Sequence, residues 1–534
     1  MTRTSRSKTR LTLLLAAALG LVTACAPGAG GGGGNSGSGA GTLVIGMTAS
    51  DIPLLDTGLS QNQGYEGIRF VGNQLYDGLT RFDLKQGQTI PGVKPDLATD
   101  WAVDSTGTKW TFHLRPDVTF HDGTPFNADA AVFNFDRYLN KSSPDFYPDL
   151  NAQAGLSVAG ITGATKIDDM TIEVDTDGPL SYLPSNLTTV FFASPTAVKK
   201  EGNDGFAKNP VGTGPFKFAS YERGQQLVMT ANDKYWDGRP KVDKVVLRPI
   251  PDATARVAAL RSGQVNWIEV PPPDDVSKLT SDGYQVLTNS YDHVWPWVLD
   301  TSKAPWNDPR VRQAANYAIN RDSLIKNVLQ GTADPALQVA PRADSGYQAA
   351  NDTYSYDPAK AKQLLADAGF PNGLDTTLSY PTSGSGNMVP TPMNEALQQD
   401  LAAVGIRVKL QPVEWASMLT DFFQGKIPGG ADAINISLSM QQEGFWCTWF
   451  CTGSSSNAGK YSNPQVDQLL TQAKSTFDDQ ARAGLYAQVS KILTQDAAWL
   501  TVVDDRNPRV LAKNVKGFVQ PQSWFVDLTT LSVG

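Results

Sequence analysis

Helix-start signals that alternate with strand signals constrain the fold of this chain most strongly. At Asp308-Pro309, Asp357-Pro358 and Asn463-Pro464, a residue that can cap a helix precedes a proline, which is favoured at the first helical position. Apolar residues at helical spacing follow each pair. Residues 405–410 lie between the last two helix starts, and their apolar and polar residues alternate as in a strand. Such alternation predicts an α/β fold, with a parallel or mixed sheet covered by helices.

Strand signals dominate the first half of the chain. They begin at residues 43–46 and recur at 110–115, where Trp110, Phe112 and Leu114 are expected to face a core because alternate strand residues share a face. We expect the helix after Pro309 to run to Gly331 and the helix after Pro358 to end at Gly369. Further strands are expected at residues 171–174, 226–229, 245–247 and 500–503.

The amino-terminal segment is typical of an exported protein. Four basic residues precede an apolar run, residues 11–22, which is shorter than the roughly 20 residues that span a membrane. The run ends in Val22-Thr23-Ala24-Cys25, which resembles the cleavage site of lipoprotein signal peptidase, so we expect Cys25 to become a lipidated amino terminus. The alternative is an ordinary signal cut nearby with Cys25 incidental. Residues 26–41 are almost all Gly, Ser and Ala and predict a flexible tether.

Charge and cysteine content exclude several classes of function. The formal net charge is −8, and loss of the four basic residues of the signal would lower it to −12, which argues against a nucleic-acid partner. Beyond Cys25 only Cys447 and Cys451 remain, and export favours a local disulfide between them. A metal pair is the alternative, but no histidine lies nearby to complete a zinc site, so we expect no metal and no cofactor.

Signals of catalysis are weak. The chain has no Gly-x-Ser-x-Gly nucleophile motif, and the Gly212-Thr213-Gly214 stretch lacks the third glycine of a dinucleotide-binding loop. Of the three histidines, His113 is expected to point outward from a strand, His121 belongs to a turn, and only His293 lies near a predicted hinge. We therefore predict a protein that is not an enzyme. A secreted hydrolase is the alternative from another class.

An ordered series of short motifs covers most of the remaining chain. It includes Leu75-Tyr76-Asp77-Gly78-Leu79, Phe120-His121-Asp122-Gly123-Thr124-Pro125-Phe126, Val211-Gly212-Thr213-Gly214-Pro215-Phe216 and Tyr461-Ser462-Asn463-Pro464. In this order they resemble the bacterial extracellular solute-binding proteins of family 5, which include the dipeptide and oligopeptide binders of ABC importers. The resemblance implies an α/β, periplasmic-binding-protein-like fold, in which two lobes enclose the ligand and a small domain is inserted into the first lobe.

The resemblance also suggests domain boundaries. About 490 residues follow the tether, which is more than one hydrophobic core usually holds. The expected boundaries are a signal peptide at residues 1–24, a tether at 25–41, a first lobe at 42–75, 210–291 and 500–534, an inserted domain at 76–209, and a second lobe at 292–499.

Aromatic residues are the strongest candidates for a ligand site. Trp295 and Trp297 flank a proline, and residues two apart in an extended segment point to the same face, so both indoles are expected to line one wall of a cleft. Trp446 and Trp449 lie in an aromatic cluster of the second lobe. Packing in a core is the alternative for each of them.

The chain departs from the peptide binders at one position. In those proteins a Trp-x-x-Asp-Tyr-Pro motif carries an aspartate that pairs with the amino group of the ligand, and here Gln441 takes its place. Either Glu443 replaces this anchor or the ligand lacks a free amino terminus. The expected ligand site is Trp295, Trp297, Gln441, Glu443, Trp446 and Trp449.

These observations predict a substrate-binding lipoprotein of an ABC transporter. It would capture a di- or oligopeptide outside the cytoplasm as a monomer, anchored to the cell membrane through Cys25, and deliver it to permease subunits with their ATPases. An oligosaccharide is the alternative ligand, because glutamine and tryptophan side chains also suit sugar hydroxyls and rings.

Overall fold

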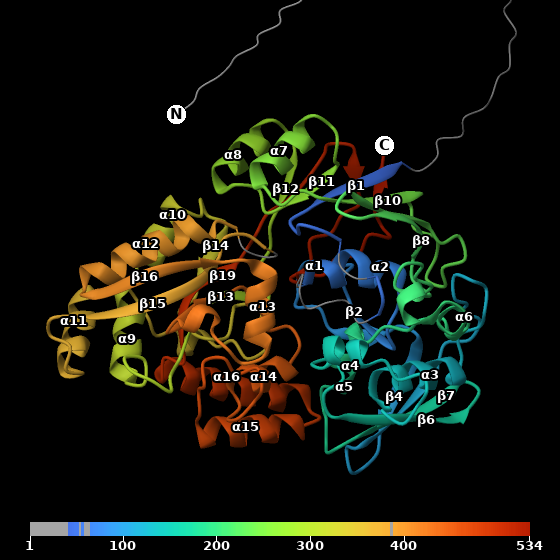
Figure 1. Ribbon diagram of the computed structural model, residues 1–534, viewed down its shortest axis with the longest axis horizontal. Coiled ribbons are helices and arrows are strands. Elements are labelled where there is room, and N and C mark those ends of the chain that lie inside the picture. The colour runs from blue at the N-terminus through green and yellow to red at the C-terminus, as the bar shows by residue number, and fades with distance from the viewer. Residues whose placement is uncertain (1–40, 53–54, 58–64, 385–387) are drawn as a thin grey trace, which may run out of the picture. The chain divides into compact units, whose positions relative to one another are not determined.

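The computed structural model describes residues 41–52, 55–57, 65–384 and 388–534. The predicted signal peptide, Cys25 and the tether up to residue 40 lie outside the described residues. Within the described part, two large seven-stranded sheets, one four-stranded sheet and two two-stranded sheets organise the chain (Figure 1). We call the part built on the first large sheet lobe I and the part built on the second lobe II.

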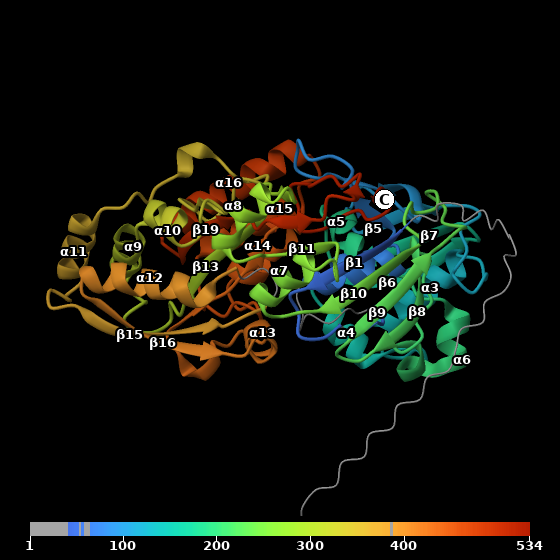
Figure 2. The same ribbon diagram turned by 90° about the horizontal axis from the view of Figure 1, so that it is seen from above.

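The first large sheet brings together strands from both ends of the chain. Its central strand β1 (Thr42–Met47) is parallel to β10 (Lys244–Pro249) and β11 (Trp267–Glu269), whereas its other pairs are antiparallel. Leu43, Ile45 and Met47 are fully buried, as expected for a strand that faces the core of its sheet. In Figure 2, β1, β10, β9 and β8 lie side by side. The remaining strands are β12 (Gln285–Leu287), β20 (Arg509–Leu511), β9 (Gln226–Ala231) and β8 (Phe216–Glu222).

The segment of lobe I between α2 (Asn73–Leu75) and β8 has a hydrophobic core of its own, which lies within residues 79–192. It packs against a four-stranded antiparallel sheet in the order β4-β5-β7-β6, in which Trp110, Phe112 and Leu114 are buried as predicted. The strands of this segment are β2 (Thr80–Phe82), β3 (Val93–Pro95), β4 (Ala98–Val103), β5 (Lys109–Leu114), β6 (Ile161–Asp168) and β7 (Thr171–Thr176). Its helices are α3 (Ala128–Leu139), α4 (Pro148–Ala154) and α5 (Leu183–Asn186). Helix α6 (Pro195–Phe206) follows this segment, and its Ala197, Val198 and Phe206 pack in the core of lobe I.

The second large sheet is mixed. Its strand order is β14-β19-β13-β17-β15-β16, and β18 also pairs with β13. Only β15 makes parallel pairs in it, with β16 and with β17. The strands are β13 (His293–Leu299), β14 (Ala333–Pro335), β15 (Leu374–Pro381), β16 (Ile406–Val413), β17 (Ala433–Asn435), β18 (Leu438–Ser439) and β19 (Trp499–Asp505).

The three predicted helix starts are confirmed. Helices α9 (Pro309–Ala318), α11 (Pro358–Asp367) and α15 (Pro464–Lys474) begin at the expected prolines, and the side chain of the preceding residue accepts a backbone N–H in each. The end of the first helix was predicted wrongly. The chain becomes extended at Ile319, and Asn320 caps a second helix, α10 (Arg321–Asn327), so Gly331 instead occupies a turn with φ of +80°. Gly369 follows α11 with φ of +92°, as expected for a helix stop.

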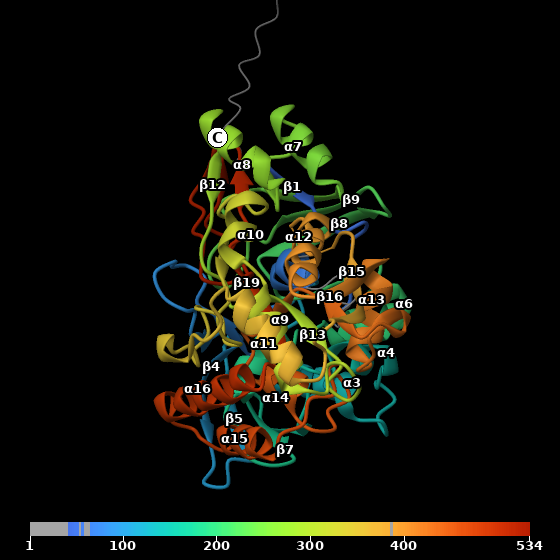
Figure 3. The ribbon, with the colours of Figure 1, turned by 90° about the vertical axis from the view of Figure 1, so that its left-hand side faces the viewer.

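The other helices surround the sheets. Figure 1 shows α12 (Pro390–Ala403) beside β16, and Figure 3 shows α14 (Gly444–Phe450), α15 and α16 (Asp479–Gln495) gathered together. The remaining helices are α1 (Tyr65–Gly67), α2 (Asn73–Leu75), α7 (Ala253–Arg261), α8 (Pro273–Ser281) and α13 (Trp415–Phe423). In the described part of the chain, no helix has the length and apolarity needed to cross a membrane.

The chain passes between the two large sheets twice, after β12 and after β19. The two crossings are joined, since the Tyr291 hydroxyl donates to the Asn507 carbonyl at 2.9 Å. Residues 500–505 were assigned to lobe I from the sequence, but they belong to lobe II, where β19 pairs with β13 and β14. The chain returns to the first sheet only at β20. The period of an apolar strand does not reveal which sheet it joins, and this explains the error.

Candidate functional site

A cavity with about 940 Å³ of empty space, part of it open to solvent, lies between the lobes. Half of its lining comes from lobe I and the segment inserted in it: Thr57, Tyr65, Ile68, Gln153, Ala154, Leu156, Ser157, Thr189, Phe191 and Trp524. The other half comes from lobe II: His293, Trp415, Leu419, Phe423, Ser437, Leu438, Ser439, Gln442, Phe445 and Trp449. Its size and its mostly apolar lining match those of small-molecule sites.

Helix α14 supplies the aromatic wall of this cavity. Phe445 and Trp449 are one helical turn apart, with ring centroids 5.7 Å from each other, and both line the cavity. Trp446 and Phe450 occupy another face of the helix and pack into the core of lobe II, where Trp446 stacks on Tyr486 at 5.7 Å. Helical periodicity therefore divides this aromatic cluster into a pair that lines the cavity and a pair that packs only in the core.

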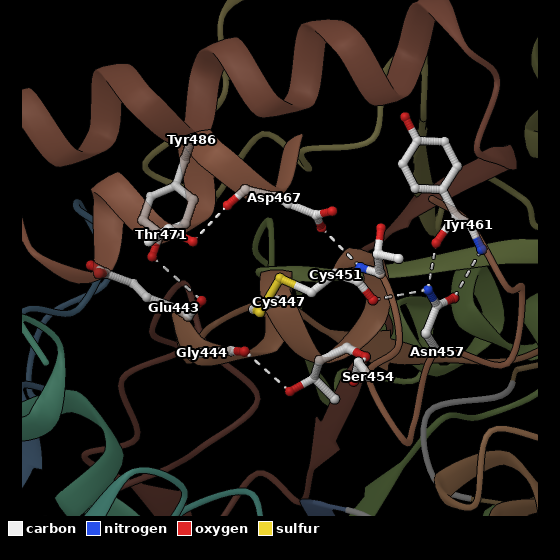
Figure 4. Close-up of a disulfide and its surroundings, with 12 residues drawn as sticks. Glu443, Gly444, Cys447, Cys451, Ser454, Asn457, Tyr461, Asp467, Thr471 and Tyr486 are labelled. Atoms are coloured by element: carbon white, nitrogen blue, oxygen red, sulfur yellow. Dashed lines mark hydrogen bonds between the residues drawn. A yellow bond between two sulfur atoms is a disulfide. The ribbon is translucent and has the colours of Figure 1, made fainter. Parts of the chain in front are cut away.

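A disulfide joins Cys447 to Cys451 across the last turn of α14 (Figure 4). The chain that follows is also secured, because the Thr452 N–H donates to the Asp467 carboxylate at 2.9 Å and the Asn457 amide donates to the Cys451 carbonyl at 3.2 Å. These contacts hold the helix that carries Trp449.

Buried charges hold Trp524 on the opposite wall. The guanidinium groups of Arg69 and Arg509 lie 4.7 and 5.6 Å from its ring centroid, within the range of cation–π attraction. Glu269 lies between the two arginines and accepts from both, at 2.8 Å from Arg509. Arg509 also donates to the Trp524 carbonyl at 2.6 Å. The carboxylate between two cations thus fixes one aromatic wall of the cavity.

Several polar groups of the cavity are already paired within the protein. His293 Nε2 lies 2.9 Å from the Ser437 hydroxyl, while its Nδ1 lies 2.9 Å from the buried carboxylate of Asp505. Gln442 donates from Nε2 to the Thr189 hydroxyl at 2.9 Å, and this bond crosses from lobe II to the inserted segment. Among the described residues that line this cavity, none is Asp, Glu, Lys or Arg.

A second cavity lies between the inserted segment and lobe II. It holds about 1560 Å³ of empty space, part of it open to solvent, and residues 440–443 contribute Met440, Gln441 and Glu443 to its lining. Gln441 accepts from the Ser523 hydroxyl at 2.7 Å. Glu443 receives Arg482 Nε at 2.6 Å, so its charge is compensated within the protein. Asp292 and Asp344 also line this cavity, which makes it acidic.

The predicted site residues fall into three groups. Trp295 and Trp297 lie in the core of lobe II with side chains 1% and 0% exposed and line neither of these cavities, and the Trp297 indole donates to Asn394 at 2.9 Å. Trp446 is also a core residue, and Trp449 faces the first cavity. Gln441 and Glu443 face the second cavity.

Sequence reasoning missed the contribution of lobe I. Tyr65 and Trp524 are 459 positions apart in the chain numbering, and no local pattern shows that they line one cavity. His293 was noted only for its place near the hinge. Asp292, the residue before β13, lines the second cavity instead.

Comparison with known proteins decides the family. The sequence profile of the bacterial extracellular solute-binding proteins, family 5 Middle, matches residues 92–456. This chain belongs to that family. A haem-binding protein A of Haemophilus influenzae is 32% identical over 469 residues, which cover 84% of each chain. The dipeptide-binding protein of Escherichia coli is 30% identical over 472 residues, covering 83% of this chain and 86% of its own.

Solved structures of the family share the fold. The periplasmic binding protein DppA of Helicobacter pylori, in complex with the peptide STSA, superposes with a TM-score of 0.80 at 27% identity, covering 92% of this chain and 98% of its own. This family 5 protein therefore has the two-lobed fold of periplasmic binding proteins, as its sequence motifs predicted. It is a solute-binding protein of the kind that serves ABC importers, and the family acts outside the cytoplasm.

Proposed function

We propose that this protein captures a short peptide between its two lobes and delivers it to the permease of an ABC importer. The observation that carries the proposal is the first cavity, because its lining is divided between lobes I and II and the Gln442–Thr189 bond closes over it. A ligand held there contacts both lobes at once. Binding therefore stabilises the closed form by the difference in its affinity for the closed and open forms.

Further contacts support closure around a ligand. The Ser181 N–H donates to the Lys474 carbonyl at 2.8 Å, and the Ser181 hydroxyl donates to the Ala473 carbonyl at 2.9 Å. The Lys474 Nζ atom also lies 3.3 Å from a carboxylate oxygen of Asp177. Each contact joins the inserted segment to lobe II. All are polar and small in number, which suits an interface that opens and closes.

A peptide is the ligand that the relatives favour. The Escherichia coli relative is named for dipeptide binding, and the Helicobacter pylori structure holds a peptide. The aromatic walls built by Phe445, Trp449 and Trp524 suit an apolar side chain of the ligand. The protein acts as a binding protein without catalysis, as a monomer, held at the membrane by a lipidated Cys25.

The test is calorimetric titration of a truncated chain, which begins at Ala26 and lacks the lipidated Cys25, with dipeptides and tetrapeptides that carry apolar side chains. Oligosaccharides and haem serve as competing ligand classes. Binding of peptides alone supports the proposal, whereas binding of a sugar or of haem alone refutes the peptide assignment. Membrane fractionation of the full chain and of its Cys25→Ala variant tests the anchor, since only the unaltered protein should pellet with membranes.

A matched pair of variants tests the place of binding. Gln442→Leu removes the bond between the lobes and should weaken peptide binding about two- to tenfold, the range expected for loss of one neutral hydrogen bond worth roughly 0.5–1.5 kcal/mol. Gln488→Leu is the control, because Gln488 is exposed on α16 and bonds only within its own helix. Equal affinities of the two variants would place the ligand elsewhere.

A further inference from the structure

One carboxyl oxygen of Asp292 is buried without a hydrogen-bond partner in the described part of the chain. The residue is 6% exposed, and its Oδ1 atom has no donor among the described residues. It directly precedes β13, in the crossing between the lobes, and lines the second cavity. Leaving a carboxyl group unpaired in a buried place is costly, so a buried unpaired carboxyl at a cavity wall indicates a ligand group that satisfies it.

The charges around Asp292 are mainly negative. Asp344 lines the same cavity, is 6% exposed, and accepts the Gly346 N–H at 2.5 Å. Burial raises the pKa of both carboxyl groups, and the charge of Asp344 raises the pKa of Asp292 further. Asp504 acts on Asp292 in the same direction. Arg482, which also lines this cavity, is bound to Glu443 and Asp479.

The opposite wall of the cavity is aromatic. Phe82, Trp101 and Trp110 of the inserted segment line it, and Trp110 packs on Phe112 with ring centroids 6.4 Å apart. Aromatic faces attract organic cations, whereas they offer little to anions. A cavity with buried carboxyl groups on one wall and indole rings on the other therefore matches a compact cationic group.

We propose that Asp292 and Asp344 form a subsite for a primary ammonium group of the ligand, such as the amino terminus of a peptide. The subsite deepens the proposed function and rests on it: Asp292 lines the second cavity and the adjacent His293 lines the first, so one ligand can contact both cavities. It supplies the anchor that is missing at Gln441, and it does so in place of Glu443, whose charge Arg482 neutralises. The ammonium group donates to the Asp292 carboxylate, and the proton that Asp292 carries in the empty protein is released to solvent.

The alternative is a purely structural role, in which the two carboxyl groups share a proton and contact no ligand. The two roles differ in ligand dependence. A subsite discriminates a free amino terminus from a blocked one, whereas a structural pair changes the affinity for both ligands equally.

The experiment compares Ala-Phe with N-acetyl-Ala-Phe on four proteins: the unaltered mature chain, Asp292→Asn, Asp344→Asn and Asp204→Asn. Asp204 is an exposed residue of α6 and is the matched control. The unaltered and control proteins should bind Ala-Phe at least tenfold more tightly than the acetylated peptide. Asp292→Asn should lose this preference, and Asp344→Asn should reduce it. Removing a buried acid that has no donor should not impair folding, and thermal unfolding checks this.

Titrations in buffers of different ionisation enthalpy give a second readout. At pH 7 the unaltered protein should release protons when it binds Ala-Phe, and Asp292→Asn should release fewer. Equal binding of Ala-Phe by the unaltered protein and Asp292→Asn overturns the subsite but leaves peptide capture intact. Equal affinity of the unaltered protein for both peptides overturns it as well. If this protein binds neither peptide but binds a solute of another class, both the proposed function and the subsite are refuted.

Discussion

Replacing Glu269 by glutamine should destabilise lobe I strongly. Glu269 lies between Arg69 and Arg509, and the side chains of the three residues are 1%, 0% and 2% exposed. The substitution keeps the shape of the side chain but removes the carboxylate that both buried guanidinium groups share. Breaking a buried ion pair by removing one partner costs about 3–5 kcal/mol, because the remaining charge stays buried and uncompensated.

The expected loss is about 3–5 kcal/mol rather than twice that value. Both arginines keep other acceptors: Arg69 and Arg509 donate to the Trp524 carbonyl at 3.4 and 2.6 Å, and Arg509 donates to Gln520 at 2.8 Å. These bonds retain part of the compensation. A loss of this size is a large fraction of the roughly 5–15 kcal/mol that stabilises a typical domain.

Urea unfolding followed by tryptophan fluorescence measures the effect. The matched control is Glu222→Gln, because Glu222 is exposed on β8 and its substitution should change stability by less than about 0.5 kcal/mol. Peptide affinity should fall with Glu269→Gln as well, since the arginines hold Trp524 at the cavity. A destabilisation below about 1 kcal/mol would show that the buried charges are compensated in another way and would refute the reasoning.

Three further predictions concern the disulfide, an acid and two tryptophans. Cys447→Ser should lower the free energy of unfolding by about 2 kcal/mol, because the bond to Cys451 closes only a short loop. Reduction of the unaltered protein with dithiothreitol should lower it by the same amount. Unchanged stability in both experiments would contradict a stabilising role of the disulfide. Burial raises the pKa of Asp344 to about 7, so its contribution to stability is complete below about pH 4 and is lost as the pH rises to about 7. The urea midpoint should therefore fall less for Asp344→Asn than for the unaltered protein between pH 5 and 8, and equal falls would disprove the assignment. Trp449→Ala should weaken binding of apolar peptides about tenfold, because Trp449 faces the first cavity. Trp297→Phe should leave the affinity unchanged but lower the free energy of unfolding by about 1 kcal/mol, because it removes the buried bond to Asn394. A loss of affinity in Trp297→Phe alone would reverse these roles.

Local sequence determined the elements that depend on neighbouring residues. Asp308, Asp357 and Asn463 each precede a proline and cap the helix that begins there, because the cap and the proline act within one turn. Trp110, Phe112 and Leu114 share the buried face of β5 for the same local reason, the period of a strand. The motif series established the family, and with it the fold.

Local patterns predicted the tryptophan roles less well. Trp295 and Trp297 do share a strand, but the face that they share packs into the core of lobe II. Periodicity shows which residues lie on one face and does not show whether that face meets a core or a cavity. On α14 the same limit applied, because Trp446 and Trp449 lie in one cluster of the sequence and on different faces of one helix.

The sequence by itself determined the α/β elements, the caps of three helices and the family. Only the tertiary structure decided that β19 belongs to lobe II, that Arg482 neutralises Glu443, and that Asp292 meets Asp344 at one cavity. The physical reason is the separation along the chain over which each interaction acts. Capping and periodicity act over a few residues, whereas the pairing of charges and the lining of a cavity depend on side chains that folding brings together from distant parts of the chain.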